Sequence, residues 1–204
     1  MNFLDFFQLS SVALFLVIVV LRASHLRLTK NINPIAIGRG KKGFSLAFEL
    51  IAFAALLIWM LEVVLHAMHS TFHVFPALLE RQLFEAVTAK SIGVVLVTAA
   101  LVLFTLAFLS FGSSWRVGLD TQTPGALVTS GTFALTRNPI FVALNLWFSG
   151  IFLINGRFGF LIFALLAAIA MHWQILREEK FLTGLYGQPY QDYRARTARY
   201  FIWF

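Results

Sequence analysis

Long runs of apolar residues alternate with short polar segments along the whole chain. Five runs approach or reach the length of about 20 mostly apolar residues that a helix needs to cross a bilayer. They cover residues 3–21, 44–67, 92–109, 139–154 and 158–176. Only Asn155-Gly156-Arg157 separates the last two runs, so we expect these two to form an antiparallel helical hairpin. The pattern predicts an all-α, polytopic membrane bundle of about five transmembrane helices.

The composition supports this prediction. Of the 204 residues, 59% are hydrophobic and 12% are charged, whereas globular domains have about 45–50% apolar and about 25% charged residues. A soluble domain of this size cannot bury so much apolar surface. The chain has no cysteine, which excludes disulfides, thiolate metal sites and a cysteine nucleophile, and leaves the redox compartment undefined.

The basic residues predict the orientation of the bundle. Thirteen of the sixteen Lys and Arg residues lie in the loop after the first run, in the loop before the fourth run, or after the fifth run. Because basic loops stay in the cytoplasm, we expect the N-terminus outside and a cytoplasmic, helical C-terminal tail, in the cell inner membrane. The net charge of +7 lies beside apolar runs, so we expect contact with membrane lipids and none with nucleic acid.

The segment 68–91 joins the second and third runs on the predicted outer side. Its apolar residues Leu78, Leu79, Leu83 and Phe84 have helical spacing. This spacing predicts an amphipathic segment that lies in the outer membrane interface.

The polar residues of the fourth run begin at its amino-terminal end. Asn138 precedes Pro139, a pair typical of a helix start because an Asn side chain caps free amides and Pro fits the first turn. The positive end of this helix therefore opens beside Arg137 and offers a place for a carboxylate or phosphate. Asn145 continues a polar stripe along the helix. Helix packing is the alternative role for Asn145, and anchoring to lipid phosphates is the alternative for Arg137.

A second polar cluster follows the fifth run. Glu178 and Glu179 come directly after an apolar helix that is antiparallel to the fourth, which places their carboxylates at the depth of Arg137. Acidic residues at the carboxyl end of a helix oppose its dipole, so helix stability does not account for them. His172 lies seven residues before Glu179 and shares its helix face. The alternative is a solvated charged end just outside the membrane.

The order and spacing of these polar elements carry a family resemblance. The elements are Gly131, the run Arg137-Asn138-Pro139-Ile140-Phe141, the pair Glu178-Glu179, the run Tyr186-Gly187-Gln188-Pro189-Tyr190-Gln191-Asp192-Tyr193, and Arg199. Together they resemble the isoprenylcysteine carboxyl methyltransferase family and its phospholipid methyltransferase relatives. The resemblance covers about residues 111–201. It divides the chain into a three-helix part, 1–110, and a cofactor-binding methyltransferase core, 111–204.

The resemblance implies an integral membrane methyltransferase that uses S-adenosylmethionine from the cytoplasm and a lipophilic or lipidated acceptor from the bilayer. It implies carboxyl O-methylation of the isoprenylcysteine type, with N-methylation of a phospholipid or other amine, or S-methylation of a thiol, as alternatives. The residues implied for the cofactor are Gly131, Phe133, Arg137, Asn138, Phe141, Asn145, Glu178, Glu179 and Tyr190. For catalysis and the acceptor, the positions of Arg177 and Arg199 suit an anionic group of the acceptor. An amine or thiol acceptor would need a base, and Glu178 or His172 would then serve.

Four positions differ from the residues that are usual in the sequence motifs of the family. Asn138 replaces a His, Phe141 a Tyr, Tyr186 a Phe, and Ile202 a Pro. An Asn side chain can donate a hydrogen bond to a carboxylate, but it cannot carry a proton. We therefore expect no acid–base role at position 138.

Two further features allow other interpretations. His172, within a span, keeps open a non-enzymatic class, a membrane transport or haem-associated protein. Glu62, His66, His69 and His73 follow one another at spacings of four, three and four, which would place metal ligands on one helix face. Because they lie at the outer end of the second run, where the helix is not assured, we expect an interfacial role and no metal site.

Overall fold

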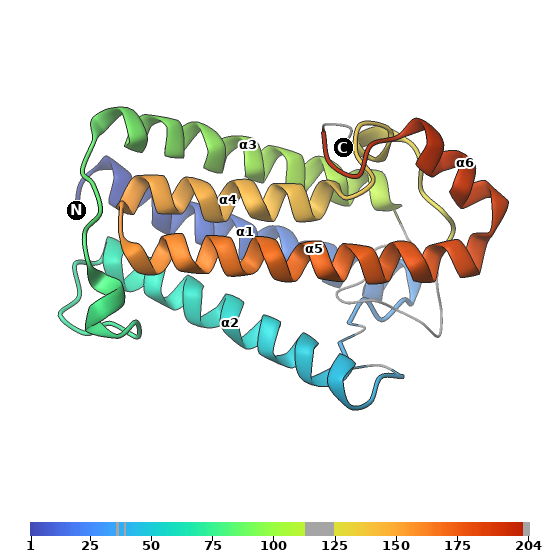
Figure 1. Ribbon diagram of the computed structural model, residues 1–204, viewed down its shortest axis with the longest axis horizontal. Helices are drawn as coiled ribbons and strands as arrows, with labels where there is room; N and C mark the ends of the chain where they lie inside the picture. The colour runs from blue at the N-terminus through green and yellow to red at the C-terminus, as the bar shows by residue number, and fades with distance from the viewer. Residues whose placement is uncertain (36, 39, 113–124, 202–204) are drawn as a thin grey trace.

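The computed structural model describes residues 1–35, 37, 38, 40–112 and 125–201. Its long helices lie side by side in one elongated bundle (Figure 1). The helices are α1 (Phe3–Lys30), α2 (Phe44–Ala67), α3 (Val87–Phe111), α4 (Pro139–Asn155), α5 (Phe158–Tyr186) and the short α6 (Gln188–Arg196), with 3₁₀ turns η1 (Ala77–Glu80) and η3 (Gly131–Ala134). The described residues contain no strand, only isolated bridge residues. The predicted all-α class is confirmed. Ile202 and residues 113–124 of the loop before α4 lie outside the described residues.

Among the described residues, four helices are long and apolar enough to cross a membrane. They are α1, α2, α3 and α5, with 28, 24, 25 and 29 residues. The fourth predicted span, α4, has 17 residues, which make about 26 Å of helix against a hydrocarbon core of about 30 Å. It nevertheless lies within the bundle, between α3 and α5 (Figure 1). The polytopic bundle is thus confirmed, whereas five crossings with an outer N-terminus stay a prediction.

Helix α1 extends beyond the apolar run that predicted it. At its start, the Asn2 side chain accepts from the Asp5 amide at 3.1 Å and the Asp5 carboxylate accepts from the Asn2 amide at 2.6 Å, a capping box. The helix ends at Lys30 rather than at residue 21. Its last turns are basic, and Arg and Lys are good helix formers. Hydropathy therefore marks the part of the helix that suits lipid, not the end of the helix.

The helical spacing in the connection between α2 and α3 does not correspond to a continuous helix, and the place of this segment in the outer interface stays a prediction. Apart from η1 this connection is irregular, and α3 begins at Val87. The backbone is instead tied to the turn between α4 and α5. The Leu83 amide donates to the Gly156 carbonyl at 2.8 Å, and the Phe158 amide donates to the Arg81 carbonyl at 2.9 Å. Tertiary hydrogen bonds outweigh a helical periodicity that covers only two turns.

The predicted hairpin of α4 and α5 is confirmed. Gly156 caps α4 in the left-handed conformation, with φ +63°, and α5 starts two residues later. A Cβ at Gly156 would lie 2.2 Å from the Phe84 carbonyl oxygen. The turn therefore needs glycine both for its backbone conformation and for the close approach of the preceding connection.

One main hydrophobic core runs through the bundle and takes residues from α1 to α5, on both sides of the division at residue 110. Trp147 of α4 stacks on Phe15 of α1 at 4.5 Å between ring centroids. Helices α3 and α4 approach closely at two glycines, since a Cβ at Gly93 would lie 2.6 Å from the Gly150 carbonyl oxygen. Such small-residue contacts are typical of helix packing in membranes. They fix α4, whose amino-terminal end bears Arg137 and Asn138.

Candidate active site

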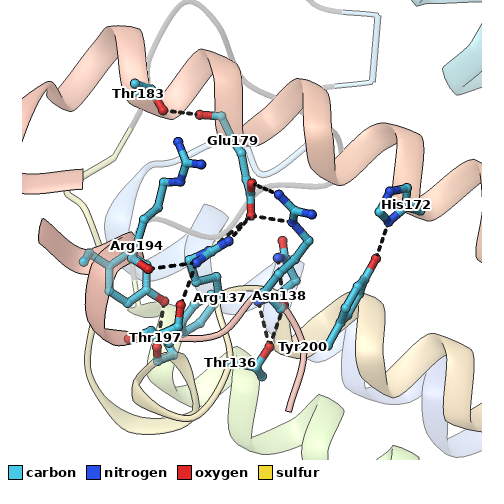
Figure 2. A network of polar contacts seen from close by, with 12 residues as sticks. Thr136, Arg137, Asn138, His172, Glu179, Thr183, Arg194, Thr197 and Tyr200 are labelled. Atoms are coloured by element: carbon cyan, nitrogen blue, oxygen red, sulfur yellow. Dashed lines mark hydrogen bonds and ion pairs between the residues drawn. The ribbon is translucent and has the colours of Figure 1, made fainter. Parts of the chain in front are cut away.

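Glu179 lies at the centre of an ion-pair network, at the end of the bundle where α6 and the C-terminal segment pack (Figure 2). Its Oε1 accepts from Arg137 Nε at 3.1 Å, Arg137 Nη2 at 2.8 Å and Arg199 Nε at 3.1 Å. Its Oε2 accepts from Arg199 Nη2 at 2.8 Å. We call these three residues the Arg–Glu–Arg cluster. Two guanidinium groups share one carboxylate, so the cluster carries a net charge of +1.

The two arginines of the cluster differ in accessibility. Arg137 Nη1 also donates to the carbonyls of Thr197 at 2.6 Å and Arg194 at 3.1 Å. Its side chain keeps 8% of its surface exposed, Glu179 keeps 6%, and Arg199 keeps 31%. Arg137 is therefore fixed by buried contacts on several sides, whereas Arg199 is the arginine that a ligand can reach.

Asn138 begins α4 as predicted, but its predicted capping role is wrong. No side chain caps this end of α4. The Asn138 Nδ2 instead donates to the Arg199 carbonyl at 3.1 Å, and Thr136 Oγ1 donates to the same oxygen at 2.9 Å. The Arg137 amide donates to the Ala198 carbonyl at 2.9 Å. The segment that begins α4 thus holds the C-terminal segment across the cluster.

The C-terminal segment also contacts His172. His172 Nδ1 and the Tyr200 hydroxyl are 2.8 Å apart (Figure 2). Tyr200 directly follows Arg199, which contacts Glu179. His172 and Glu179 therefore both contact the C-terminal segment. The predicted shared helix face of His172 and Glu179 is confirmed.

A small aromatic cluster packs α6 against η3. Phe133, Tyr190 and Tyr193 are buried together, and the Tyr193 hydroxyl donates to the Phe133 carbonyl at 2.6 Å. Burial raises the pKa of Tyr193 to about 12 and also raises the pKa of Tyr190. Phe133 and Tyr190 therefore lie inside the packing between α6 and η3. Phe141, in the first turn of α4, is partly exposed.

Arg177 and Glu178 lie on another face of α5. Glu178 Oε1 accepts from Gln174 Nε2 at 3.0 Å, and Arg177 donates to the hydroxyl of Ser45 at the start of α2. The Arg177 guanidinium also lies 4.5 Å from the centroid of the Trp173 ring. Consecutive residues of an α-helix point about 100° apart. The structure therefore brings Glu179, but not Glu178, together with Arg137, Asn138 and Arg199.

Gly131 and Asn145 have contacts that concern packing. Gly131 has φ +63°, and a Cβ there would lie 2.3 Å from Ser110 Oγ of α3. Asn145 Nδ2 donates to the Phe141 carbonyl at 3.0 Å within its own helix. Neither residue touches the Arg–Glu–Arg cluster through a hydrogen bond of the described structure.

Sequence reasoning missed Thr136, Thr197 and Tyr200. Thr197 contributes only its backbone carbonyl, and a carbonyl has no signal in the sequence. Thr136 and Tyr200 contact the site because the C-terminal segment turns back across α4 and α5, a path that the sequence does not specify.

The comparisons with known proteins bear on the same region. A model of a protein family described as phospholipid methyltransferase matches residues 88–189, half of the chain. The match runs from α3 to the first turn of α6 and includes Arg137, Asn138 and Glu179. Arg199 follows the matched segment. No curated protein matches the chain significantly.

Proposed function

Because the chain belongs to the phospholipid methyltransferase family, we propose that it transfers a methyl group from S-adenosylmethionine to the carboxylate of a lipophilic acceptor. Membership of this family and the four apolar helices make it an integral membrane methyltransferase. One observation carries the finer proposal. The buried pair of Arg137 and Glu179 joins the start of α4 to the end of α5, and the accessible Arg199 lies beside it.

The residues of the site fit the carboxylate of the donor. The net charge of +1 suits a carboxylate, and Arg199 presents an accessible guanidinium that can bind one through two hydrogen bonds. The amino-terminal end of α4, without a side-chain cap at Asn138, adds its positive dipole. Phe133 and Tyr190, with 6% and 1% of their surface exposed, pack α6 against η3 and offer no open face to the donor in this conformation.

Glu179 is the carboxylate that would bind the ammonium of the donor, and this assignment requires a rearrangement. Both of its oxygens accept from arginines. Arg137 is held by two backbone carbonyls besides Glu179, so Arg199 is the arginine that can turn away. In this proposal Arg199 exchanges Glu179 for the donor's carboxylate and leaves Glu179 Oε2 for the ammonium.

The lack of a general base in the cluster favours a carboxylate acceptor. The donor supplies an electrophilic methyl group, whose bond to sulfur breaks as its bond to the acceptor oxygen forms, which leaves a neutral thioether. A carboxylate is already ionised near pH 7 and has no proton to lose. An amine or thiol acceptor must lose one. Within the cluster, two guanidinium groups occupy Glu179, while Glu178 lies outside it and accepts from Gln174 of its own helix.

A phospholipid amine is the second candidate acceptor, because the matched family is described by that activity. In either case the acceptor is lipophilic and reaches the site from the bilayer. An isoprenylcysteine-type acid is the lipophilic carboxylate that the sequence resemblance favours.

The test uses purified protein in nanodiscs, incubated with methyl-labelled donor and with native lipids or a prenylcysteine acid. Label that alkali releases is a methyl ester and supports the proposal. Alkali-stable label in phospholipid assigns the second candidate and overturns carboxyl methylation. Arg199→Gln should lose donor binding, whereas Arg196→Gln, an exposed arginine of α6, is the matched control. If neither the donor nor its demethylated product raises the melting temperature of the wild type, the proposal fails, since saturation at about 100 times Kd adds about 2.7 kcal/mol.

A further inference from the structure

Four potential metal ligands converge at the opposite end of the bundle from the Arg–Glu–Arg cluster, near the N-terminus (Figure 1). Glu62 and His66 come from the last turns of α2, His73 from the following connection, and Glu80 from η1. One ligand atom from each side chain lies within 4.8 Å of the other three. We call this group the His–Glu cluster. The sequence indicated three of its members but not Glu80.

Three distances within the His–Glu cluster are close to the edges of a tetrahedron around a metal ion. His66 Nε2 lies 3.3 Å from Glu62 Oε1 and 3.0 Å from Glu80 Oε2, and His73 Nδ1 lies 2.8 Å from Glu62 Oε1. Zinc bonds to nitrogen and oxygen of about 2.0–2.1 Å place tetrahedral ligand atoms about 3.3 Å apart. All four ligand atoms lie within 4.8 Å of one another, so the wider pairs must move closer together to bind one ion.

Two buried atoms of the cluster lack hydrogen-bond partners. Among the described residues, His66 Nε2 and Glu80 Oε1 have none, and the His66 side chain is only 8% exposed. The nitrogen faces two carboxylates at ion-pair distance, but the alignment is not that of a hydrogen bond. Buried polar atoms are nearly always satisfied, and a metal ion between these groups would satisfy both.

The surroundings of Glu62 hold it in the orientation of a ligand. Its side chain is fully buried, and its Oε2 accepts from the amides of Val74 at 2.7 Å and Phe75 at 3.1 Å. These hydrogen bonds hold the carboxylate so that its Oε1 faces the imidazoles of His66 and His73. Metal-binding side chains are typically fixed in this way by backbone hydrogen bonds.

His69, which the sequence placed on the same stripe, lies outside the cluster. Helix α2 ends at Ala67, and His69 has a left-handed conformation with φ +53°. The chain therefore turns back, so that His73 returns to Glu62, while His69 Nε2 reaches Asp5 Oδ2 at 2.9 Å.

We propose that Glu62, His66, His73 and Glu80 bind one divalent transition-metal ion of the zinc class. Two nitrogen and two oxygen ligands suit zinc, whereas Ca²⁺ and Mg²⁺ take oxygen ligands. Arg157 Nη1 lies 3.6 Å from Glu80 Oε2 and contributes one positive charge. When the imidazoles are neutral, the two carboxylates leave a net charge of −1, which attracts a divalent cation. A cavity of about 330 Å³, lined in part by His66 and His73, gives the ion a path.

The role of the ion follows from which segments it joins. Four protein ligands close the coordination sphere, as in structural zinc sites. The ion would fix His73 and Glu80 to α2, and the connection that carries them is tied to the turn between α4 and α5. It would therefore clamp this end of the bundle and take no part in methyl transfer.

The test uses the full chain in detergent, with its affinity tag removed and its metal stripped by a chelator. Titration with Zn²⁺ should give one ion per chain and a higher melting temperature. Co²⁺ should give the intense visible absorption of tetrahedral coordination. Glu80→Gln and His66→Gln should weaken Zn²⁺ binding by more than the roughly 10–100-fold that loss of a supporting outer contact costs.

His69→Gln is the matched control, because His69 belongs to the same connection and lies outside the cluster. It should keep the affinity and the Co²⁺ spectrum. Absence of Zn²⁺ binding to the wild type, an octahedral Co²⁺ spectrum, or an equal loss of affinity in His69→Gln would each overturn the proposal. None of these measurements depends on methyl transfer, so they stand apart from a failure of the proposed function.

Discussion

Replacing Glu179 by Gln tests whether the Arg–Glu–Arg cluster holds the C-terminal segment on the bundle. The substitution keeps the shape of the side chain but removes its charge and one acceptor oxygen. Arg137 and Arg199 then face an amide that also presents an N–H₂ group. We expect a lower free energy of unfolding, because Arg137 stays buried without a counterion.

The burial of each partner sets the expected magnitude. Arg137 and Glu179 keep 8% and 6% of their side-chain surface exposed, and removal of one partner of a buried ion pair costs about 3–5 kcal/mol. Arg199 keeps 31% exposed, so water screens it and its removal costs about 1 kcal/mol or less. We expect Glu179→Gln to destabilise the protein several times more than Arg199→Gln does. In the Glu179→Gln background, Arg199→Gln should cost almost nothing.

The assay is thermal unfolding in detergent, followed by far-UV circular dichroism. One kcal/mol shifts the melting temperature of a chain of this size by about 2–4 °C, so Glu179→Gln should lower it by roughly 10 °C. Asp192→Asn, at an exposed carboxylate of α6 that accepts from Gln188, is the control and should stay within about 2 °C. Equal shifts for Glu179→Gln and Arg199→Gln, or a shift no larger than the control's, would refute the reasoning.

Three further predictions concern packing, pH and the two acids. Gly150→Leu should lower the melting temperature by several degrees, because its Cβ would lie 2.7 Å from a side chain of α3, whereas Gly184→Ala, with open space around it, should not. The pKa of Tyr193 is raised to about 12. The stability that its buried neutral hydroxyl adds is therefore complete below pH 10 and falls as the pH rises from 10 to 12. Across this range the melting temperature should fall less steeply in Tyr193→Phe than in the wild type. Glu179→Gln should reduce donor binding, measured by calorimetry, far more than Glu178→Gln, and equal losses would contradict the geometry.

Short sequence motifs correctly predicted those features of the fold that depend on a few neighbouring residues. The hairpin follows from Asn155-Gly156, since the glycine conformation at the end of α4 is a property of a few neighbouring residues. The start of α4 at Asn138 follows in the same way from Pro139. The depth of Glu179 relative to Arg137 follows from counting residues along two antiparallel helices.

Rotation of a helix about its axis is not a local property. The rotation of α5 determines which of Glu178 and Glu179 faces the Arg–Glu–Arg cluster, because consecutive side chains point about 100° apart. Packing sets this rotation: α5 presents Trp173 to Phe48 of α2 at 4.6 Å between ring centroids, which places Arg177 beside α2 as well. The sequence therefore assigned the pair to a site but could not separate its members.

Comparison of the two ends of the bundle explains why they suit ligands of opposite charge. Each end has a buried carboxylate, Glu179 or Glu62, held by groups from separate segments. At Glu179 the partners are guanidinium groups, which stay protonated at any physiological pH and leave a positive excess that attracts an anion. At Glu62 the partners are imidazoles, which can lose their protons and present lone pairs. With Glu80 beside them the net charge at that end is negative. We therefore expect that end to attract a metal cation and the other end to attract an anion, such as the carboxylate of the proposed methyl donor.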